Sequence, residues 1–301
     1  MITKNAVSND GCPRSFFEIS QLLVAASLYA LFNVAMPLIR LPHGNVGFGV
    51  YVLGVLVSTS IFMWLQLRVL SALGTVAIRL PQEVIVIFAS IALWIAILSE
   101  HKHFPTSPMS LITVSLMLNL AITFGCGTFG RLVSRIVKEP NVLLPISLVA
   151  IPIDFFGAMM KFGFTNNMVR AHPGIVKNVS VGVPSFLNHG ASALVQTSLI
   201  GPGDIVFITF FFTAVRRLNM NCRATFNWMY AGLTVAMLVV IFVPGFAVAA
   251  LIPMGFSVIA ANWRHFRLSR AEAFATGYVI VMVVALALSF YVYTNIKIFR
   301  G

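Results

Sequence analysis

Residues 192–217 read SALVQTSLIGPGDIVFITFFFTAVRR, and this stretch decides what kind of protein the chain forms. It is apolar almost throughout, contains one acidic residue, Asp204, and ends in the two arginines Arg216 and Arg217. A helix needs about 20 apolar residues to cross a bilayer. The stretch is therefore typical of a membrane-spanning segment that carries an ionisable group in its interior.

The composition of the whole chain points the same way. Of the 301 residues, 59% are hydrophobic and 9% are charged, and the mean hydropathy is +0.94. A soluble domain has about 25% charged residues, so this chain cannot cover a water-facing surface. The net charge of +12 is spread over short loops between apolar runs, which argues against a nucleic-acid partner. We expect an all-α polytopic membrane protein in contact with the lipid bilayer.

Apolar runs of sufficient length recur along the chain and predict about nine transmembrane helices in a single transmembrane domain, residues 1–301. This domain divides into N-terminal helices (16–140), a core with the intramembrane acids (141–265) and one extra C-terminal helix (272–296). The connection at 162–190 is expected to form a surface loop or to re-enter the membrane. The predicted spans are 16–38, 47–67, 83–99, 109–130, 141–161, 191–215, 225–243, 246–262 and 272–296.

The basic residues predict how these spans are oriented, because cytoplasmic loops carry an excess of Lys and Arg. With nine spans, thirteen of the 20 basic residues fall on the side of the N-terminus. We therefore expect a cytoplasmic N-terminus, with the 162–190 loop and the C-terminus outside. The seven basic residues on the outer side are Arg40, Lys102, Lys161, Arg170, Lys177, Lys297 and Arg300.

Only two acidic residues, Asp154 and Asp204, lie well inside predicted spans. A charge at the bilayer centre costs about 2.5–3.5 kcal/mol on insertion scales. Each acid is about 13 residues into its span, so both are expected near mid-membrane in consecutive antiparallel helices, where one can hydrogen-bond the other. A lone intramembrane Asp can be a helix-packing residue, but two at matching depth favour a functional pair.

Gly201, Pro202 and Gly203 come directly before Asp204. Proline removes a helix hydrogen-bond donor, and glycine tolerates an unwound backbone. A broken helix at membrane depth is tolerated only where it is buried in protein or lines a water-filled cavity. We therefore expect Asp204 to face a wet cavity.

A pair of aspartates in contact has a defined chemistry. The two carboxyls share one proton, because like charges at contact cannot both ionise. The ionised member takes a proton from water, which attacks an amide carbonyl, and the protonated member hydrogen-bonds the developing oxyanion. Because the pair titrates as one unit, neither Asp154 nor Asp204 is assigned a fixed role.

These residues resemble a known family. GPGDIVFITFFFTAVRRLNMN (201–221) resembles the GxGD region of the signal peptide peptidase and presenilin intramembrane aspartyl proteases, and is closest to the signal peptide peptidase form. IPIDFFGAMM (151–160) resembles the segment around the family's other catalytic Asp, and the similarity covers roughly 141–265. The resemblance implies a presenilin-like helix bundle that cleaves transmembrane segments with Asp154 and Asp204, without a metal or cofactor.

The family's third signature, a Pro-Ala-Leu motif two helices after GxGD, has two placements in this chain. Residues 244–246 keep the proline, whereas residues 249–251, followed by a proline at 253, keep the Ala-Leu pair. Both placements stay open at the level of sequence. The resemblance implies these substrate-binding residues: Gly201, Gly203, Pro244, Gly245, Phe246, Ala250, Leu251 and Pro253.

The chain departs from the family pattern at several points. Ile153 stands where an aromatic residue usually precedes the first Asp, four spans rather than five precede Asp154, and an extra helix follows the third motif. The orientation from the charge count is that of signal peptide peptidase, which implies type II membrane segments, with a cytoplasmic N-terminus, as substrates.

Two other classes of membrane protein also carry acidic residues beside helix breaks. Prepilin peptidases carry a GxGD motif followed by a lysine two residues after the Asp, where this chain has Ile205-Val206. Secondary transporters place carboxylates and broken helices at the midplane, and an inactive protease homologue could act as a channel or chaperone. Substitution of Asp204 by asparagine separates the alternatives: a protease loses cleavage, whereas a transporter loses ion-coupled flux.

Overall fold

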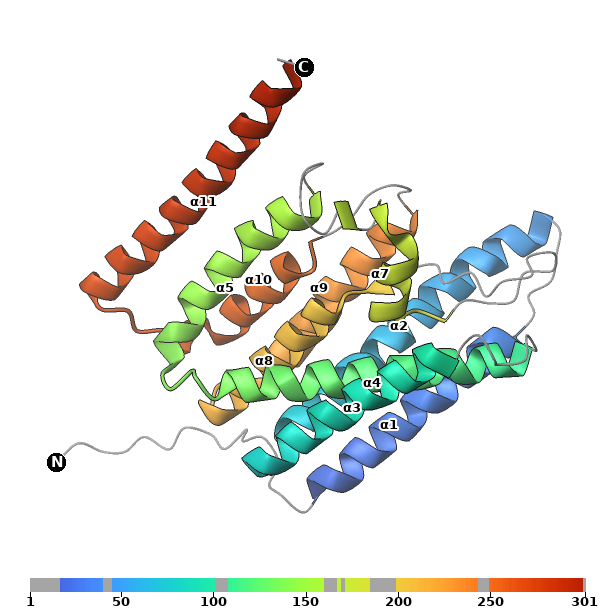
Figure 1. Ribbon diagram of the computed structural model, residues 1–301. Helices are drawn as coiled ribbons and strands as arrows, with labels where there is room; N and C mark the ends of the chain where they lie inside the picture. Colours follow the sequence, from blue (N-terminus) through green and yellow to red (C-terminus); the bar gives the residue numbers. More distant parts are fainter. Residues whose placement is uncertain are drawn as a thin grey trace.

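The computed structural model shows an almost entirely helical protein (Figure 1). It describes residues 17–39, 45–100, 108–159, 167–168, 171–184, 199–242 and 249–299. The helices are α1 (Phe17–Ala35), α2 (Asn45–Thr75), α3 (Leu80–Glu100), α4 (Pro108–Ser134), α5 (Pro140–Asp154), α7 (Pro173–Val179), α8 (Pro202–Arg217), α9 (Cys222–Phe242), α10 (Leu251–Asn262) and α11 (Arg270–Phe299). Shorter elements are the helical turns η1 (Met36–Leu38), η2 (Phe155–Met159) and η3 (Trp263–His265) and the strands β1 (Val181–Gly182) and β2 (Leu199–Ile200).

Six helices in the described part of the chain are long and apolar enough to cross a membrane, which supports an all-α, multi-pass membrane protein. They correspond to the first five predicted spans and to the span predicted at 225–243. The predicted number of nine is not confirmed. The six segments are Ile19–Leu38, Val52–Thr75, Leu80–Glu100, Met109–Ser134, Pro140–Gly157 and Cys222–Phe242.

The other three predicted spans differ for separate reasons. The span predicted at 191–215 becomes helical only at Pro202, so α8 has 16 residues and a length of about 24 Å, short of the roughly 30 Å hydrocarbon core. The span predicted at 246–262 contains the 12-residue α10. Helix α11 extends over the predicted span 272–296, but many side chains in its C-terminal half lie outside the described part.

Helix α3 shows why the outer surface of this protein needs lipid. Its side chains Ile85, Phe88 and Ile95 are 64%, 66% and 55% exposed. Soluble monomers rarely expose contiguous apolar surface on this scale. The exposed face of α3 therefore fits contact with acyl chains rather than with water.

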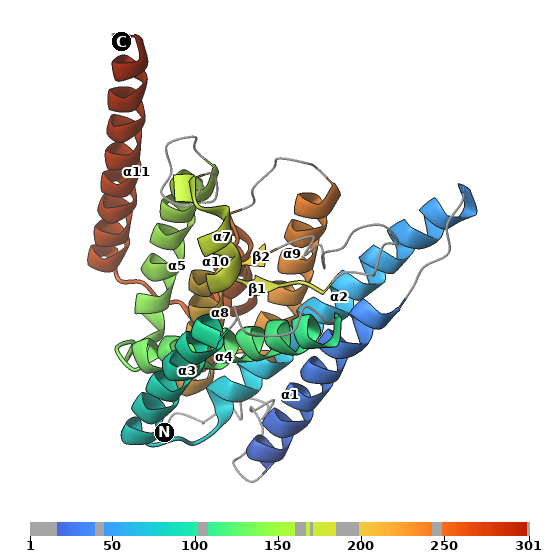
Figure 2. The same cartoon turned by 45° about the vertical axis from the view of Figure 1, so that its right-hand side comes forward.

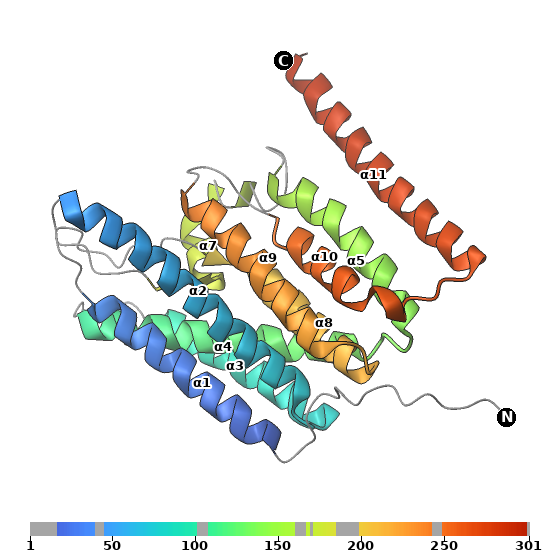
Figure 3. The same cartoon turned by 180° about the vertical axis from the view of Figure 1, so that it is seen from behind.

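Helix α8 is the centre of the bundle. It packs against α4 and α2 on one side and contacts α9 and α10 on the other, and the run Ile208–Val215 along it is buried throughout. Helix α10 packs against both α5 and α9, and α11 lies beyond α5 at the edge of the bundle (Figures 1, 2 and 3). The apolar sequence after Asp204 thus forms the protein core rather than a lipid-facing surface.

Small residues allow α4 and α8 to approach closely. A Cβ atom added at Gly130 of α4 would overlap the backbone carbonyl of Val206 of α8. A Cβ at Gly127 would lie 2.7 Å from the side chain of Leu73 and 3.3 Å from that of Thr209. Membrane helices commonly use glycine where two backbones meet, and these two positions fix how α8 lies on α4.

One buried ion pair joins the neighbouring helices α3 and α4. Oε1 of Glu83, whose side chain is fully buried, lies 2.6 Å from Nε of Arg131 and 2.9 Å from a terminal nitrogen of Arg135. Arg131 also donates a hydrogen bond to the carbonyl oxygen of Leu73. The charge of Glu83 is therefore compensated by two arginines, one in the last turn of α4 and one directly after it.

The described part of the 162–190 connection is folded back into the protein. Helix α7 leads into β1, which pairs antiparallel with β2 so that Val181 faces Ile200 and Gly182 faces Leu199. Val181 is fully buried. This segment is therefore not a simple surface loop, and the short β1–β2 pair was not predicted by the apolar pattern.

Candidate functional site

Asp204 lies in the first turn of α8, directly after the helix break that the Gly-Pro-Gly stretch predicted. Gly201 is the N-cap of the helix and Pro202 its first residue, where the missing N–H of proline costs nothing. Oδ2 of Asp204 accepts a hydrogen bond from the backbone N–H of Gly201 at 3.2 Å. An acidic residue at this position commonly bonds back to the N-cap. The predicted helix break is therefore present, and it places the carboxyl at a helix N-terminus.

The two glycines beside Asp204 have different surroundings. A Cβ atom at Gly201 would lie 3.3 Å from Oδ2 of Asp204, which is a tight approach. A Cβ at Gly203 would meet no atom within 4 Å, and Gly203 is exposed. Gly201 therefore gives the carboxylate room to reach the N-cap, whereas Gly203 leaves open space next to it.

Asp154 is the last residue of α5 and is followed by the π-helical turn η2. The helix contains two internal prolines, Pro145 and Pro152, which remove backbone donors and favour an irregular end. Oδ2 of Asp154 accepts a hydrogen bond from the backbone N–H of Leu251 at 2.8 Å. Leu251 is the first residue of α10, so this carboxyl also lies at a helix N-terminus.

The fold brings Asp154 and Asp204 together from the C-terminal end of one helix and the N-terminal end of another. The two carboxyls lie within electrostatic range of each other, and both are partly buried. Helix α5 packs chiefly on α10 and α11 rather than on α8, so the expected direct pairing of consecutive helices is wrong. Helix α10 connects the two, because it packs against α5 and also contacts α8.

The N-termini of α8 and α10 converge on the pair. A helix N-terminus carries a partial positive charge and unsatisfied N–H groups, which favour an anion. Each carboxylate accepts one such N–H, from Gly201 and from Leu251. Within the described part of the chain, the Oδ1 atoms of Asp154 and Asp204 accept no hydrogen bond. Two backbone N–H groups at helix N-termini therefore stabilise the negative charge of the site.

The structure describes one of the two placements of the Pro-Ala-Leu-like motif, residues 249–251. Leu251 contacts Asp154 directly, and Ala250 lines a cavity together with Asp204. Pro253 lies one turn into α10, and a Cβ atom added at Gly232 of α9 would lie 3.1 Å from its ring. The alternative placement, Pro244, Gly245 and Phe246, lies outside the described residues.

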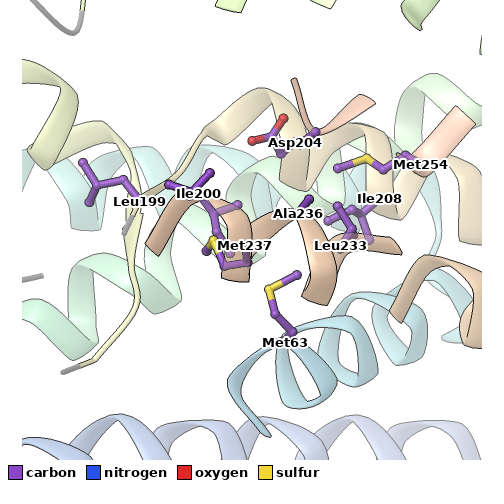
Figure 4. A pocket seen from close by; sticks show the side chains of 11 residues that line it. Met63, Leu199, Ile200, Asp204, Ile208, Leu233, Ala236, Met237 and Met254 are labelled. Atoms are coloured by element: carbon purple, nitrogen blue, oxygen red, sulfur yellow. The ribbon is translucent and has the colours of Figure 1, made fainter. Parts of the chain in front are cut away.

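A cavity of about 80 Å³ opens beside Asp204 (Figure 4). Among the described residues that line it, Asp204 is the charged one, and the others are apolar side chains from α2, α8, α9, β2 and the start of α10. A water molecule needs roughly 10–15 Å³ of such space, so a few waters fit next to the carboxylate. Residues that the sequence did not assign to the site include Met63, Leu199, Ile200, Leu233, Met237 and Met254.

The apolar lining carried no signal of its own in the sequence. Met63 and Leu233, for example, stand in uniformly apolar spans where every position looks alike. In such spans, a residue can be assigned to a site from sequence only when it stands next to a marked feature. Ile200 is one of these, because it directly precedes the Gly-Pro-Gly stretch and Asp204.

Comparisons with models of known protein families, with curated proteins and with solved structures found no match for this chain.

Proposed function

We propose that this protein is an intramembrane aspartyl protease that hydrolyses peptide bonds within transmembrane segments. The observation that carries the proposal is the meeting of Asp154 and Asp204, 50 positions apart, at two broken helix ends beside a small cavity. They are the only acids well inside the predicted spans, since the glutamates within span bounds lie at the span edges. Polar residues at such depth are rare and typically functional.

In the proposed reaction, the pair holds one proton between two carboxyls. The ionised carboxyl removes a proton from a water in the cavity as that water attacks the amide carbonyl, and the protonated carboxyl donates to the carbonyl oxygen. The resulting tetrahedral intermediate collapses when the amide nitrogen receives a proton and the C–N bond breaks. The N–H groups of Gly201 and Leu251 hold the carboxylates in place, and no metal or cofactor is required.

Substrate binding is proposed for the residues around the pair. The open space at Gly203 supports the approach of an unwound substrate backbone next to Asp204, since a side chain there would narrow it. Ala250 and Leu251 lie between the two acids and support a docking role for the start of α10. The expected occupants are transmembrane peptides or proteins of type II orientation, following the basic-residue distribution.

The proposal is tested with purified full-length protein in detergent and a type II transmembrane peptide. We expect cleavage that is abolished by Asp154→Asn and by Asp204→Asn, because either change removes one of the two proton-transfer groups. Thr209→Val is the matched control, since Thr209 is buried on the same helix and its hydroxyl donates to the carbonyl oxygen of Ile205 within that helix. Mass spectrometry of the products locates the cleaved bond.

Three results would count against a protease. Cleavage that survives loss of either aspartate, or that a zinc chelator stops, would remove the pair from the chemistry. Wild-type protein that leaves every such peptide intact but moves protons or ions into liposomes in an Asp204-dependent manner would favour a transporter, the alternative that also uses broken helices and midplane acids.

A further inference from the structure

Asn119, in the middle of α4, makes an unusual contact with a strand. Its Nδ2 donates to the carbonyl oxygen of Gly182 at 3.2 Å, and its Oδ1 accepts from the backbone N–H of Gly182 at 3.1 Å. The second Nδ2 hydrogen is donated to Oδ1 of Asn33 on α1 at 3.1 Å. Asn119 is 3% exposed. A side-chain amide thus pairs with the backbone of β1 as a neighbouring strand would.

This contact is connected to Asp204 through three consecutive links. Gly182 pairs with Leu199 in the β1–β2 ladder. β2 ends at Ile200, and the next residue, Gly201, donates its N–H to Oδ2 of Asp204. Because β2 is only two residues long, the start of α8 depends on what holds its partner strand β1. That holder is α4, through the Asn119 amide.

A second anchor holds the same segment from α3. Nε1 of Trp94 donates to the carbonyl oxygen of Asn178 at 2.9 Å, near the end of α7. Trp94 also lines an apolar cavity of about 480 Å³ that lies between α3, α4, α7 and the face of α8 carrying Pro202 and Val206. The hydrogen bonds of Trp94 and Asn119 therefore hold the α7–β1 segment together with the buried packing of Val181.

The polar character of position 119 requires an explanation. An apolar residue of the same size would fit a membrane helix at no desolvation cost, whereas a buried amide is favourable only when its donors and acceptor are used. All three hydrogen-bonding positions of Asn119 are used, two of them on Gly182. Without it, the N–H and C=O of Gly182 would lose these partners in an apolar interior.

We infer that Asn119 is a positioning residue that holds the β1–β2 pair against α4 and thereby sets the place of the Asp204 carboxyl. The connection from Asn119 through the β1–β2 pair to Asp204 is inferred from the hydrogen bonds, whereas its effect on catalysis rests on the proposed protease function. A misplacement of about 1 Å in a reacting group costs on the order of 100-fold in rate. Loss of the link therefore acts on the chemical step rather than on substrate binding.

The test compares Asn119→Leu with Thr123→Val in the purified full-length protein. Thr123 lies one turn further along α4, is fully buried, and accepts a hydrogen bond from Gln66 of α2, so its loss perturbs the same helix without touching β1. We expect Asn119→Leu to lower kcat by about 10- to 100-fold with little change in KM, while Thr123→Val leaves both unchanged. Hydrogen exchange is expected to become at least about tenfold faster in peptides covering 180–184 and 199–204 for Asn119→Leu only.

Trp94→Phe provides a second variant should Asn119→Leu fail to fold, because it removes one N–H and keeps the ring. It is expected to speed exchange in the same two segments. Unchanged exchange there in both variants, or equal effects of Asn119→Leu and Thr123→Val, would overturn the inference. If wild-type protein cleaves no peptide, the proposed function fails, and the exchange data alone then decide whether Asn119 holds the strand pair.

Discussion

At the scale of single residues, the two aspartates share one environment. Asp154 receives an N–H from the first residue of α10, and Asp204 receives one from the N-cap of α8. Two helix N-termini thus replace the basic side chain that a carboxylate usually needs in an apolar interior. This arrangement stabilises one negative charge at the pair, and among the described residues neither aspartate forms a salt bridge.

The buried charge of Glu83 is instead compensated by ion pairs with arginine side chains. Because Glu83 is fully buried against Arg131 and Arg135, Glu83→Gln leaves two arginines without their anion. We expect a loss of about 3–5 kcal/mol in the free energy of unfolding, measured by thermal and denaturant unfolding in detergent. Glu100→Gln, at the exposed other end of α3, is the control with no expected change. A Glu83→Gln protein as stable as wild type would show that the pair is not needed for folding.

At the scale of elements, α8 shows what a sequence does and does not reveal. The Gly-Pro-Gly stretch predicted a helix break, and the structure begins α8 at Pro202. The start of this helix was nevertheless placed too early, because the residues before the break were counted as helix although Leu199 and Ile200 form a strand. A two-residue strand leaves no periodic pattern, since its formation depends on a partner far along the chain.

The sequence left two placements of the Pro-Ala-Leu-like motif open, residues 244–246 or 249–251. The structure describes only the second, in which the N–H of Leu251 bonds Asp154. The choice depends on which backbone N–H reaches a carboxylate in space. No property of the sequence near Asp154 contains that information.

Of the two glycines at the crossing of α4 and α8, Gly130 makes the closer approach. A Cβ atom at Gly130 would overlap the carbonyl oxygen of Val206, so Gly130→Ala must push the helices apart. We expect a destabilisation of about 1–3 kcal/mol, typical of overpacking, together with reduced cleavage, because Val206 lies half a turn from Asp204. Thermal unfolding and the peptide assay measure the two effects.

Gly277→Ala is the matched control for this substitution. Gly277 lies in α11 with no atom within 4 Å of an added Cβ. Alanine there is expected to leave stability unchanged or to raise it slightly, since glycine is the poorer helix former. Equal behaviour of the two alanine variants would show that the close approach of α4 and α8 is not needed.

At the scale of the whole molecule, basic residues from separate helices meet neighbouring helix ends. Arg217 at the end of α8 donates to the carbonyl oxygen of Ser134 at the end of α4. The start of α5 and the turn before α11 also meet, since Asn141 exchanges hydrogen bonds with the backbone of Arg267. Helix α7 lies toward the opposite end of α5 (Figure 1). Composition and apolar runs were sufficient to predict a multi-pass helical protein, but not the number of spans, because α8 and α10 are shorter than the bilayer is thick.

This arrangement predicts the sidedness of the chain. Single cysteines at Lys138 and Arg264, in a background in which the native cysteines are replaced, are expected to react with an impermeant maleimide only from the cytoplasmic side. A cysteine at His172, exposed beside α7, is expected to react only from the opposite side. Labelling of inside-out and right-side-out vesicles measures this. Reaction of all three from one side would contradict the topology, and the reverse pattern would contradict the type II substrate orientation.

The central claim, that Asp154 and Asp204 act as one pair on a peptide bond, is tested most directly by an uncleavable peptide. In this peptide a secondary alcohol replaces the carbonyl of the cleaved bond, and its Kd is measured for wild type and for Asp154→Asn and Asp204→Asn. We predict that wild type binds the alcohol at least about 100-fold more tightly than the substrate peptide, as a mimic of the tetrahedral state, and that either substitution removes this advantage. Equal affinity of wild type for both peptides, or an advantage that persists in both variants, would contradict the account.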